Sequence, residues 1–573
     1  MVAAAPQLQK RLSVQVEDIA PDITTIRSLD WDRDRFDIEF GLQNGTTYNS
    51  FIIRGDKLAL IDSSHAKFRA LYLDTLRGQI DPASIDYIVI SHTEPDHSGL
   101  MADLLDLAPN AIVVGAKVAI AFLENLVHRP FERIQVKNGD TLDLGQGHTL
   151  QFVSAPNLHW PDTIFTYDHK SQILFTCDAF GMHYCSDDLY DADLAALSPD
   201  FRFYYECLMA PNARSVLSAM KRMDTLPEIS TIATGHGPLL HHNLQELTGR
   251  YRRWSQEKSK SETLVAVFYT SDYGYSDRLS QAIARGITKT SIAVEMMDLR
   301  SADTHDVNEL VGRATGLVIG MPPSSGSSDI QAAIGTIFAA VHDKQTVGLF
   351  ESYGGDDEPI DTLVNRFRDL ELRTAFAPIR IKDTPDEAIY QFCEETGTDL
   401  GQFLGQAKKL KKLKSLDAEM EKALGRISSG LYIITARKGD LTSAMLASWV
   451  SQASFQPLGF TVAVAKDRAI ESFMQVGDQF VLNVLEESNY NHLMKHFLKR
   501  FPPGADRFAG VRTRPAINGS PLLGDALAYI ECTVASRMEM SDHWLVYSTV
   551  QDGKVSDPDG LTAVHHRKVG TYY

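Results

Sequence analysis

The residues of this chain best suited to chemistry lie in the stretch Ser91–Gly99, whose sequence is S-H-T-E-P-D-H-S-G. Four of its side chains can bind a metal, and they directly follow the apolar run Tyr87–Ile90. Such a run indicates a buried strand, and the proline-containing loop at its end can direct several side chains to one point. Two imidazoles and two carboxylates suit a divalent cation such as iron, manganese or zinc. The four residues are His92, Glu94, Asp96 and His97.

Three more candidate ligands follow along the chain, each at a strand end or in a turn rich in glycine or proline. His159 lies between two prolines, Asp178 closes the apolar run Ile173–Cys177, and His236 stands between two glycines. Four histidines and three carboxylates are too many for one tetrahedral zinc. They fit two neighbouring metals that share a carboxylate, and the absence of cysteine from the set argues against structural zinc.

The order H-x-E-x-D-H, then His159, Asp178 and His236, resembles the diiron site of the flavodiiron proteins. That family carries its site on a metallo-β-lactamase-like αββα sandwich, and the hydrolases of this fold usually have histidine in place of Glu94. A hard oxygen donor favours iron over zinc, which favours redox chemistry over hydrolysis. By resemblance, the catalytic residues are His92, Glu94 and His159 on one iron, Asp96, His97 and His236 on the other, and Asp178 as the bridge.

Length and composition limit the alternatives. A chain of 573 residues has room for about three or four domains. The net charge of -18 argues against nucleic acid as a partner, because phosphate binding needs a basic face. Five scattered cysteines without C-x-x-C indicate a reducing compartment. With no apolar run of about 18 residues and no signal or transit peptide, we expect a cytoplasmic protein.

We expect residues 1–258 to form the metal domain, with early strands within 46–53 and 58–62. His183 is either a neighbour that supports the metal ligands or an ordinary surface or packing residue. Many flavodiiron proteins have a pocket histidine where the nearest candidate in this chain is Asp37. The polarity of the substrate pocket is therefore expected to differ from that of those relatives.

A second domain is predicted at 263–405, where three apolar strands of the parallel-sheet kind are each followed by a loop rich in serine and glycine. The strands are Leu264–Tyr269, Gly316–Gly320 and Thr346–Phe350. Loops at the carboxyl ends of such strands bind ligands, and the first offers backbone N–H groups to a phosphate. The arrangement resembles the doubly wound sheet of flavodoxin and implies FMN. The expected FMN residues are Ser271, Asp272, Tyr273, Gly274, Tyr275, Ser276, Ser324, Ser325, Gly326, Ser352, Tyr353, Gly354 and Gly355.

A basic segment at 406–415, with five lysines from Lys408 to Lys414, marks a boundary. It is either a solvated linker or a docking patch for an acidic electron donor or a membrane surface. Alternating strands in 416–573 predict a small β-barrel, and the order of its segments resembles flavin-reductase-like domains. The resemblance places Ala447, Ser448 and Ser451 on a second flavin, FMN or FAD, and allows NAD(P)H there.

This domain order resembles the fused flavodiiron proteins of oxygenic phototrophs. It implies reduction of O2 to water as a photosynthetic electron sink, with electrons from NAD(P)H or ferredoxin. Partners would be a second copy paired head to tail or a paralogue, and the protein could lie peripherally at photosynthetic membranes. Reduction of NO, a zinc hydrolase and a non-catalytic subunit of a hetero-oligomer stay as alternatives. Glu94 disfavours the hydrolase, and the full set of seven ligands disfavours the silent subunit.

Overall fold

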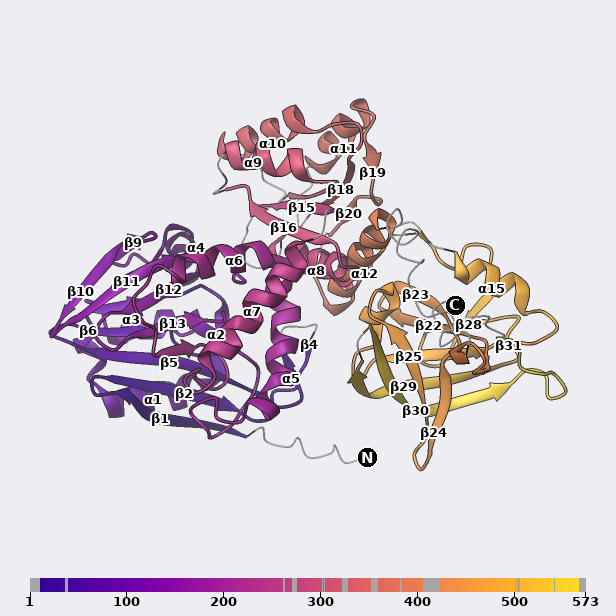
Figure 1. The fold of residues 1–573 in the computed structure, drawn as a ribbon, viewed down its shortest axis with the longest axis horizontal. Helices are drawn as coiled ribbons and strands as arrows, with labels where there is room; N and C mark the ends of the chain where they lie inside the picture. Colours follow the sequence, from indigo (N-terminus) through magenta and orange to yellow (C-terminus); the bar gives the residue numbers. More distant parts are fainter. Residues whose placement is uncertain are drawn as a thin grey trace. The chain divides into compact units, whose positions relative to one another are not determined.

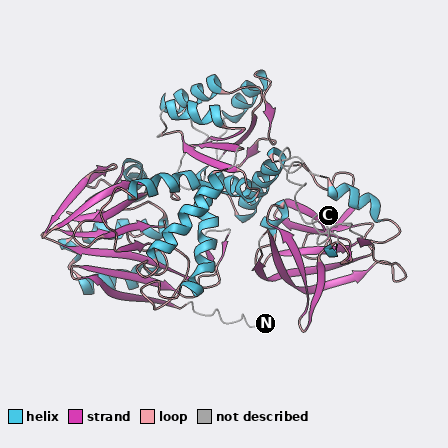
Figure 2. Cartoon of the chain, in the orientation of Figure 1, coloured by secondary structure: helices cyan, strands magenta, loops and turns pink. Residues whose placement is uncertain are grey.

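The computed structural model describes residues 11–565 except 37–39, 261–262, 271–275, 301, 303, 322–327, 352–358, 382–383, 406–422, 500, 502–504 and 541. The chain forms two compact units. The first comprises residues 1–37 and 42–260, and the second comprises residues 38–41 and 261–573. Figure 1 shows the elements of both units, and Figure 2 distinguishes their helices from their strands.

The first unit is built on two sheets packed face to face (Figure 1). The larger sheet is antiparallel from β1 to β6 and parallel from β6 to β9. In spatial order its strands are β1 (Leu12–Ala20), β2 (Ile23–Asp30), β5 (Thr46–Arg54), β6 (Leu58–Ile61), β7 (Tyr87–Val89), β8 (Ile112–Ala116) and β9 (Arg133–Val136). The smaller sheet contains β10 (Thr141–Gly145), β11 (His148–Ser154), β12 (Ile164–Asp168), β13 (Ile173–Cys177) and β14 (Thr231–Thr234).

Apolar side chains from the facing strands fill the space between the sheets, including Phe51, Ile61, Phe152 and Phe175. A second core joins the outer face of the larger sheet to α1, α3 and α4, and α6 contacts the smaller sheet. Because each sheet is apolar on both faces, helices must cover the outer faces. The result is the predicted αββα sandwich. Its helices are α1 (Arg69–Gln79), α2 (Pro95–Ser98), α3 (Met101–Leu107), α4 (Lys117–Val127), α5 (Leu194–Tyr204), α6 (Ala213–Met223) and α7 (Leu244–Ser259).

The second unit begins with a parallel sheet of the flavodoxin type, in the order β16-β15-β17-β18-β19, with β20 also paired to β18. Helices α8 and α12 cover one face of the sheet, and α9, α10 and α11 cover the other. The strands are β15 (Leu264–Tyr269), β16 (Ala293–Asp298), β17 (Gly316–Met321), β18 (Thr346–Glu351), β19 (Arg373–Thr374) and β20 (Ile379–Arg380). The helices are α8 (Ser276–Lys289), α9 (Thr304–Arg313), α10 (Ser328–Ala340), α11 (Pro359–Asp369) and α12 (Glu387–Leu404).

The C-terminal part contains an antiparallel sheet whose strands follow the order β23-β22-β26-β29-β30-β25-β24. These strands give the mixed fold that the sequence predicted, while closure into a barrel stays a prediction. Their bounds are β22 (Tyr432–Lys438), β23 (Leu441–Ala447), β24 (Val450–Phe455), β25 (Leu458–Ala465), β26 (Gln479–Val484), β29 (Ala528–Glu539) and β30 (His543–Val555). In the sequence, the short helix η6 (Ala469–Phe473) lies between β25 and β26, and helix α15 (Tyr490–Leu498) lies between β26 and β29. The domain limits 1–258, 263–405, 406–415 and 416–573 stay predictions too.

In the described part of the chain, no helix is both long enough and apolar enough to span a bilayer.

Helices α8 and α12 approach each other unusually closely because both carry glycine at the contact. A Cβ at Gly286 of α8 would collide with the carbonyl oxygen of Glu394, and one at Gly397 of α12 with that of Ile283. Backbone atoms cannot move aside as a flexible side chain can. The two helices can therefore keep this spacing only while glycine occupies the contact.

We predict that Gly286→Ala destabilises this domain by about 1–3 kcal/mol, because the added methyl group forces the two helices apart. The matched control is Gly335→Ala in α10, where a Cβ would meet nothing within 4 Å. There the same change should stabilise by about 0.5–1 kcal/mol through helix propensity. Thermal unfolding followed by calorimetry compares the two variants, and equal shifts in melting temperature would contradict the close-packing account.

Candidate metal centre

The seven candidate ligands converge at one edge of the two sheets of the first unit. His92, Glu94, Asp96 and His97 come from the loop and short helix α2 that follow β7. Pro95 occupies the first turn of α2, where its fixed φ suits a helix start and its missing N–H costs nothing. The turn places Asp96 and His97 on a helix that directly follows Glu94.

The other three ligands follow strands of the smaller sheet. His159 lies between β11 and β12, Asp178 comes directly after β13, and His236 follows β14. Because β11 and β14 both run parallel to β13, these three positions share one edge of that sheet. All seven residues are buried, and none is more than 7% exposed.

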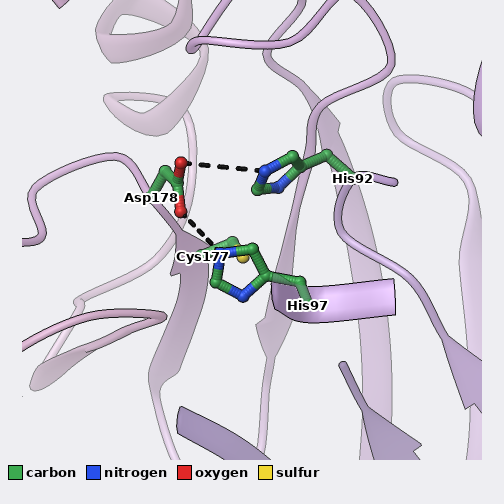
Figure 3. A group of neighbouring side chains, drawn as sticks. All are labelled: His92, His97, Cys177 and Asp178. Carbon is green, nitrogen blue, oxygen red and sulfur yellow. Dashed lines mark ion pairs between the residues drawn. The ribbon is translucent and has the colours of Figure 1, made fainter. Parts of the chain in front are cut away.

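Asp178 lies at the centre of the group, and its two carboxylate oxygens face different partners. Its Oδ2 is 2.9 Å from Nε2 of His159 and 3.7 Å from Nε2 of His92. Its Oδ1 is 2.9 Å from Nε2 of His97 and 3.4 Å from Nε2 of His236. Figure 3 shows this carboxylate pointing between His92 and His97. The group therefore divides into two halves around one carboxylate.

The other two carboxylates each belong to one half. Glu94 Oε2 lies 2.9 Å from Nε2 of His159 and 3.3 Å from Nε2 of His92. Asp96 lies 3.4 Å from Nε2 of His236 and 3.5 Å from Nε2 of His97. Within each half the potential ligand atoms lie within 4.8 Å of one another, which is the spacing that a shared metal ion requires.

The hydrogen bonding of these atoms is a second, independent indication that the group binds metal ions. Nε2 of His97, Nε2 of His236 and both carboxylate oxygens of Asp178 are buried and have no hydrogen-bond partner among the described residues. Buried polar atoms are almost always satisfied, so a set of orphaned acceptors facing one point indicates a cation. Three carboxylates would offset most of the charge of two divalent ions.

Charge pairing dominates the electrostatics of the cluster. Burial alone would lower the pKa of His92, but the charge of Asp178 and a hydrogen bond to Glu94 raise it to about 9. Burial would raise the pKa of Asp178, but the charges of His92 and His97 hold it well below its usual range. The cluster therefore retains positive charge, either as protons on the imidazoles or as metal ions that displace them.

Neighbouring groups fix the orientation of the ligands. His236 donates from Nδ1 to the carbonyl oxygen of Thr47 at 2.6 Å, which leaves Nε2 free to face Asp178. Asp162 accepts hydrogen bonds from the backbone N–H and hydroxyl of Thr93, at 2.9 and 2.6 Å. These bonds hold the loop between β7 and α2 in the shape that aims its four ligands inward.

Three side chains lie beside the candidate ligands. The sequence left the role of one of them open and did not predict the other two. His183 packs 4.7 Å from the ring of His236, and its Nδ1 lies 2.7 Å from the hydroxyl of Thr46, so it supports a ligand and is not one itself. Cys177 approaches His92, His97 and Asp178. Burial and the charge of Asp62 raise the pKa of its thiol well above the usual value, so the thiol stays protonated. Tyr204 is also buried, 6.2 Å from the ring of His236.

The predicted flavin residues are only partly described. Ser276 is buried at the start of α8, while the other predicted FMN residues, at 271–275, 324–326 and 352–355, lie outside the described residues. Asp37, the candidate for the pocket position of the metal domain, and the basic segment at 406–415 lie outside them too. Each of the three predicted loops directly follows one of the neighbouring parallel strands β15, β17 and β18.

In the C-terminal part, Ala447 ends β23 and Ser448 is buried, whereas Ser451 is exposed. The hydroxyl of Ser448 has no hydrogen-bond partner among the described residues. The ring of Trp449, which directly follows Ser448, lies 5.0 Å from that of His543.

Comparison with known proteins identifies the parts of the chain. Residues 46–237 match the family described as "ODP family beta lactamase", and residues 424–572 match the "Flavin reductase like domain". The metal-soaked Flv1 flavodiiron core from Synechocystis sp. superposes with a TM-score of 0.64 at 38% identity, covering 69% of this chain and 100% of that chain.

Relatives match the chain from end to end. "Diflavin flavoprotein A 1" of Synechocystis sp. is 69% identical over 565 residues, covering 99% of both chains. "Putative diflavin flavoprotein A 3" of Nostoc sp. is 66% identical over 574 residues, covering 100% of both. The chain therefore belongs to the diflavin flavoprotein A family of flavodiiron oxidoreductases, whose members combine iron and flavin with a flavin-reductase-like domain.

Proposed function

We propose that this protein reduces O2 to water at a diiron centre that receives its electrons through FMN. The observation that carries the proposal is the position of Asp178, whose two oxygens each face one half of a buried, carboxylate-rich ligand set. Oxygen donors in both halves favour iron over zinc. With four electrons available at once, from two ferrous irons and one reduced FMN, O2 can reach water without release of superoxide or peroxide.

The ligand assignment follows the two halves. We propose that one iron is held by His92, Glu94 and His159, the other by Asp96, His97 and His236, and that Asp178 bridges them. The distances within the cluster support this division, since each half pairs two imidazoles with a carboxylate of its own.

The surrounding side chains exclude water and hold a proton close to the site. Phe36 packs 4.0 Å from His183 and 6.2 Å from His236, and Tyr48 lies 5.6 Å from His236. Burial and the charge of Asp178 raise the pKa of Tyr204 well above its usual value, and its hydroxyl has no hydrogen-bond partner among the described residues. Tyr204 thus keeps its proton at Oη, where it can donate a hydrogen bond to a substrate oxygen.

Electrons enter through flavin. We propose that FMN binds at the three loops after β15, β17 and β18, because ligands bind at the carboxyl ends of such strands. A second flavin would bind near Ser448, because its hydroxyl is buried and has no hydrogen-bond partner among the described residues, which supports a polar ligand there. NAD(P)H or ferredoxin is the proposed donor.

We further propose that two chains pair head to tail, so that the FMN of one lies near the diiron centre of the other. A two-fold pair makes this contact twice with one self-complementary interface. The several family members found in Nostoc sp. support a paralogue as the alternative partner.

The reductase activity is tested by O2 uptake of the iron- and flavin-loaded protein with NADH, NADPH or reduced ferredoxin. We expect about two NAD(P)H oxidised per O2, with little peroxide. Glu94→Gln should lower the rate at least about 100-fold, because it removes a charged ligand of one half. The matched control is Glu132→Gln at an exposed position, which should leave the rate unchanged.

Two outcomes would contradict the proposal. One is NO consumption far faster than O2 consumption under the same electron supply, which would make the protein an NO reductase. The other is absence of both activities in protein with full iron and flavin content, which would indicate a non-catalytic subunit.

The paired arrangement is tested by mixing two inactive variants. A His92→Ala chain lacks an iron ligand, and a Gly274→Trp chain is designed to obstruct the predicted FMN loop. Heterodimers should recover up to about half of the wild-type activity, since one of the two composite sites is intact. Native mass spectrometry confirms that heterodimers are present; activity at the background of the separate variants would then rule out electron transfer between subunits.

A further inference from the structure

Helix α12 has an acidic face that is buried. Glu394, Glu395 and Asp399 are each only 6% exposed, although acidic residues almost never lose contact with water unless they are paired. The same helix supplies Tyr390, Cys393 and Leu400 to the core under the parallel sheet. The three acidic side chains need partners of opposite charge to be buried there.

The first set of partners starts on α8 and continues into the C-terminal part. Arg285 donates from Nε to Glu394 at 2.7 Å, and Lys289 forms ion pairs with both Glu394 and Glu471. Glu471 belongs to η6, which lies beyond the segment 406–422 in the sequence. Lys289 therefore joins the domain at 263–405 to the C-terminal domain.

Glu471 is held between cations from both sides. Besides Lys289 it pairs with Arg537 of β29, and it is only 3% exposed. Burial alone would raise the pKa of Glu471, but the charges of Lys289 and Arg537 lower it to about 2. If this carboxylate were removed, Arg537 would lose its carboxylate partner and Lys289 would keep only its pair with Glu394 among the described residues.

A second, separate set of ion pairs crosses between the same domains. Arg507 donates from Nη2 to Glu395 at 2.9 Å and to Asp399 at 2.7 Å, and its own side chain is buried. Ser443 of β23 also donates to Glu395. Both acidic residues of α12 are thus paired with a single arginine of the C-terminal domain, and burial raises the pKa of Asp399 to about 7.

A third contact lies closer to the start of α12. Lys438 at the end of β22 pairs with Glu387 and, at 2.9 Å, with Asp478. At two places, acidic residues of α12 pair with basic residues of the C-terminal domain. At a third place the charges are exchanged, because Lys289 of α8 pairs with Glu471 of the C-terminal domain. Because each surface carries charges of both signs, the two surfaces are complementary in only one relative position.

We propose that the acidic face of α12, together with Arg285 and Lys289 of α8, is a dock for the chain's own C-terminal domain, locked by Glu471 and Arg507. Residues 263–405 and 423–565 then move as one body, and the basic segment between them is not what holds them together. Where the proposed function holds, the C-terminal domain passes electrons from a fixed position on the FMN domain.

Association of the two halves after the chain has been cut tests the dock. A specific protease site replaces residues 408–414 in the full-length protein, and cutting separates the chain into an N-terminal and a C-terminal fragment. We expect the cut fragments to elute together in gel filtration at micromolar concentration. Glu471→Gln or Arg507→Met should raise the dissociation constant roughly 100-fold or more, because each strands buried charges.

Matched controls use ion pairs that lie inside the C-terminal domain. Glu539→Gln breaks an exposed pair with Lys466, and Arg512→Met breaks an exposed pair with Asp525. Both should change the dissociation constant by less than about threefold, as exposed pairs contribute little. Circular dichroism of each uncut variant checks that the substitution leaves the chain folded.

Two outcomes would overturn the dock. One is that the fragments of the unsubstituted protein separate on cutting. The other is that Glu471→Gln and Arg507→Met dissociate no more readily than the controls. None of these measurements depends on O2 uptake, so failure of the dock and failure of the proposed activity are distinguishable.

Discussion

The buried carboxylate of Asp178 is the constraint on which the rest of the first unit depends. Four imidazoles approach its two oxygens, two on each side, in a region that water does not reach. A single carboxylate in that position is stable only when cations compensate it. The strands β11, β13 and β14 bring His159, Asp178 and His236 to one edge, and the loop after β7 closes the site from the other sheet.

The same electrostatic rule organises the second unit with a different result. At the candidate metal centre, several buried carboxylate and imidazole atoms have no hydrogen-bond partner among the described residues, which indicates metal ions. On α12, buried carboxylates meet arginine and lysine side chains, so no ion is required. Both clusters would be costly to break, and we propose that the first serves chemistry while the second fixes the position of a domain.

The sequence predicted the seven candidate ligands that the fold brings together, because all of them lie at strand ends or in glycine and proline turns, which local patterns reveal. It also placed β15, β17 and β18, whose apolar runs match the observed strands. It left the role of His183 open and missed Tyr204 and Cys177, because only tertiary packing brings those residues to the site. The acidic face of α12 resembles any solvated helix face until its partners, such as Arg507, are located in space.

We propose that Asp178 serves two irons at once, and the metal content of three variants tests this proposal. The account predicts about two irons per chain in the unsubstituted protein, at least one fewer in His159→Ala, and almost none in Asp178→Ala. His148→Ala, which changes a buried histidine at the start of β11, remote from the ligand at the other end of that strand, should keep both. Retention of one iron or more by Asp178→Ala, or stoichiometric zinc in protein made with ample iron, would contradict the account.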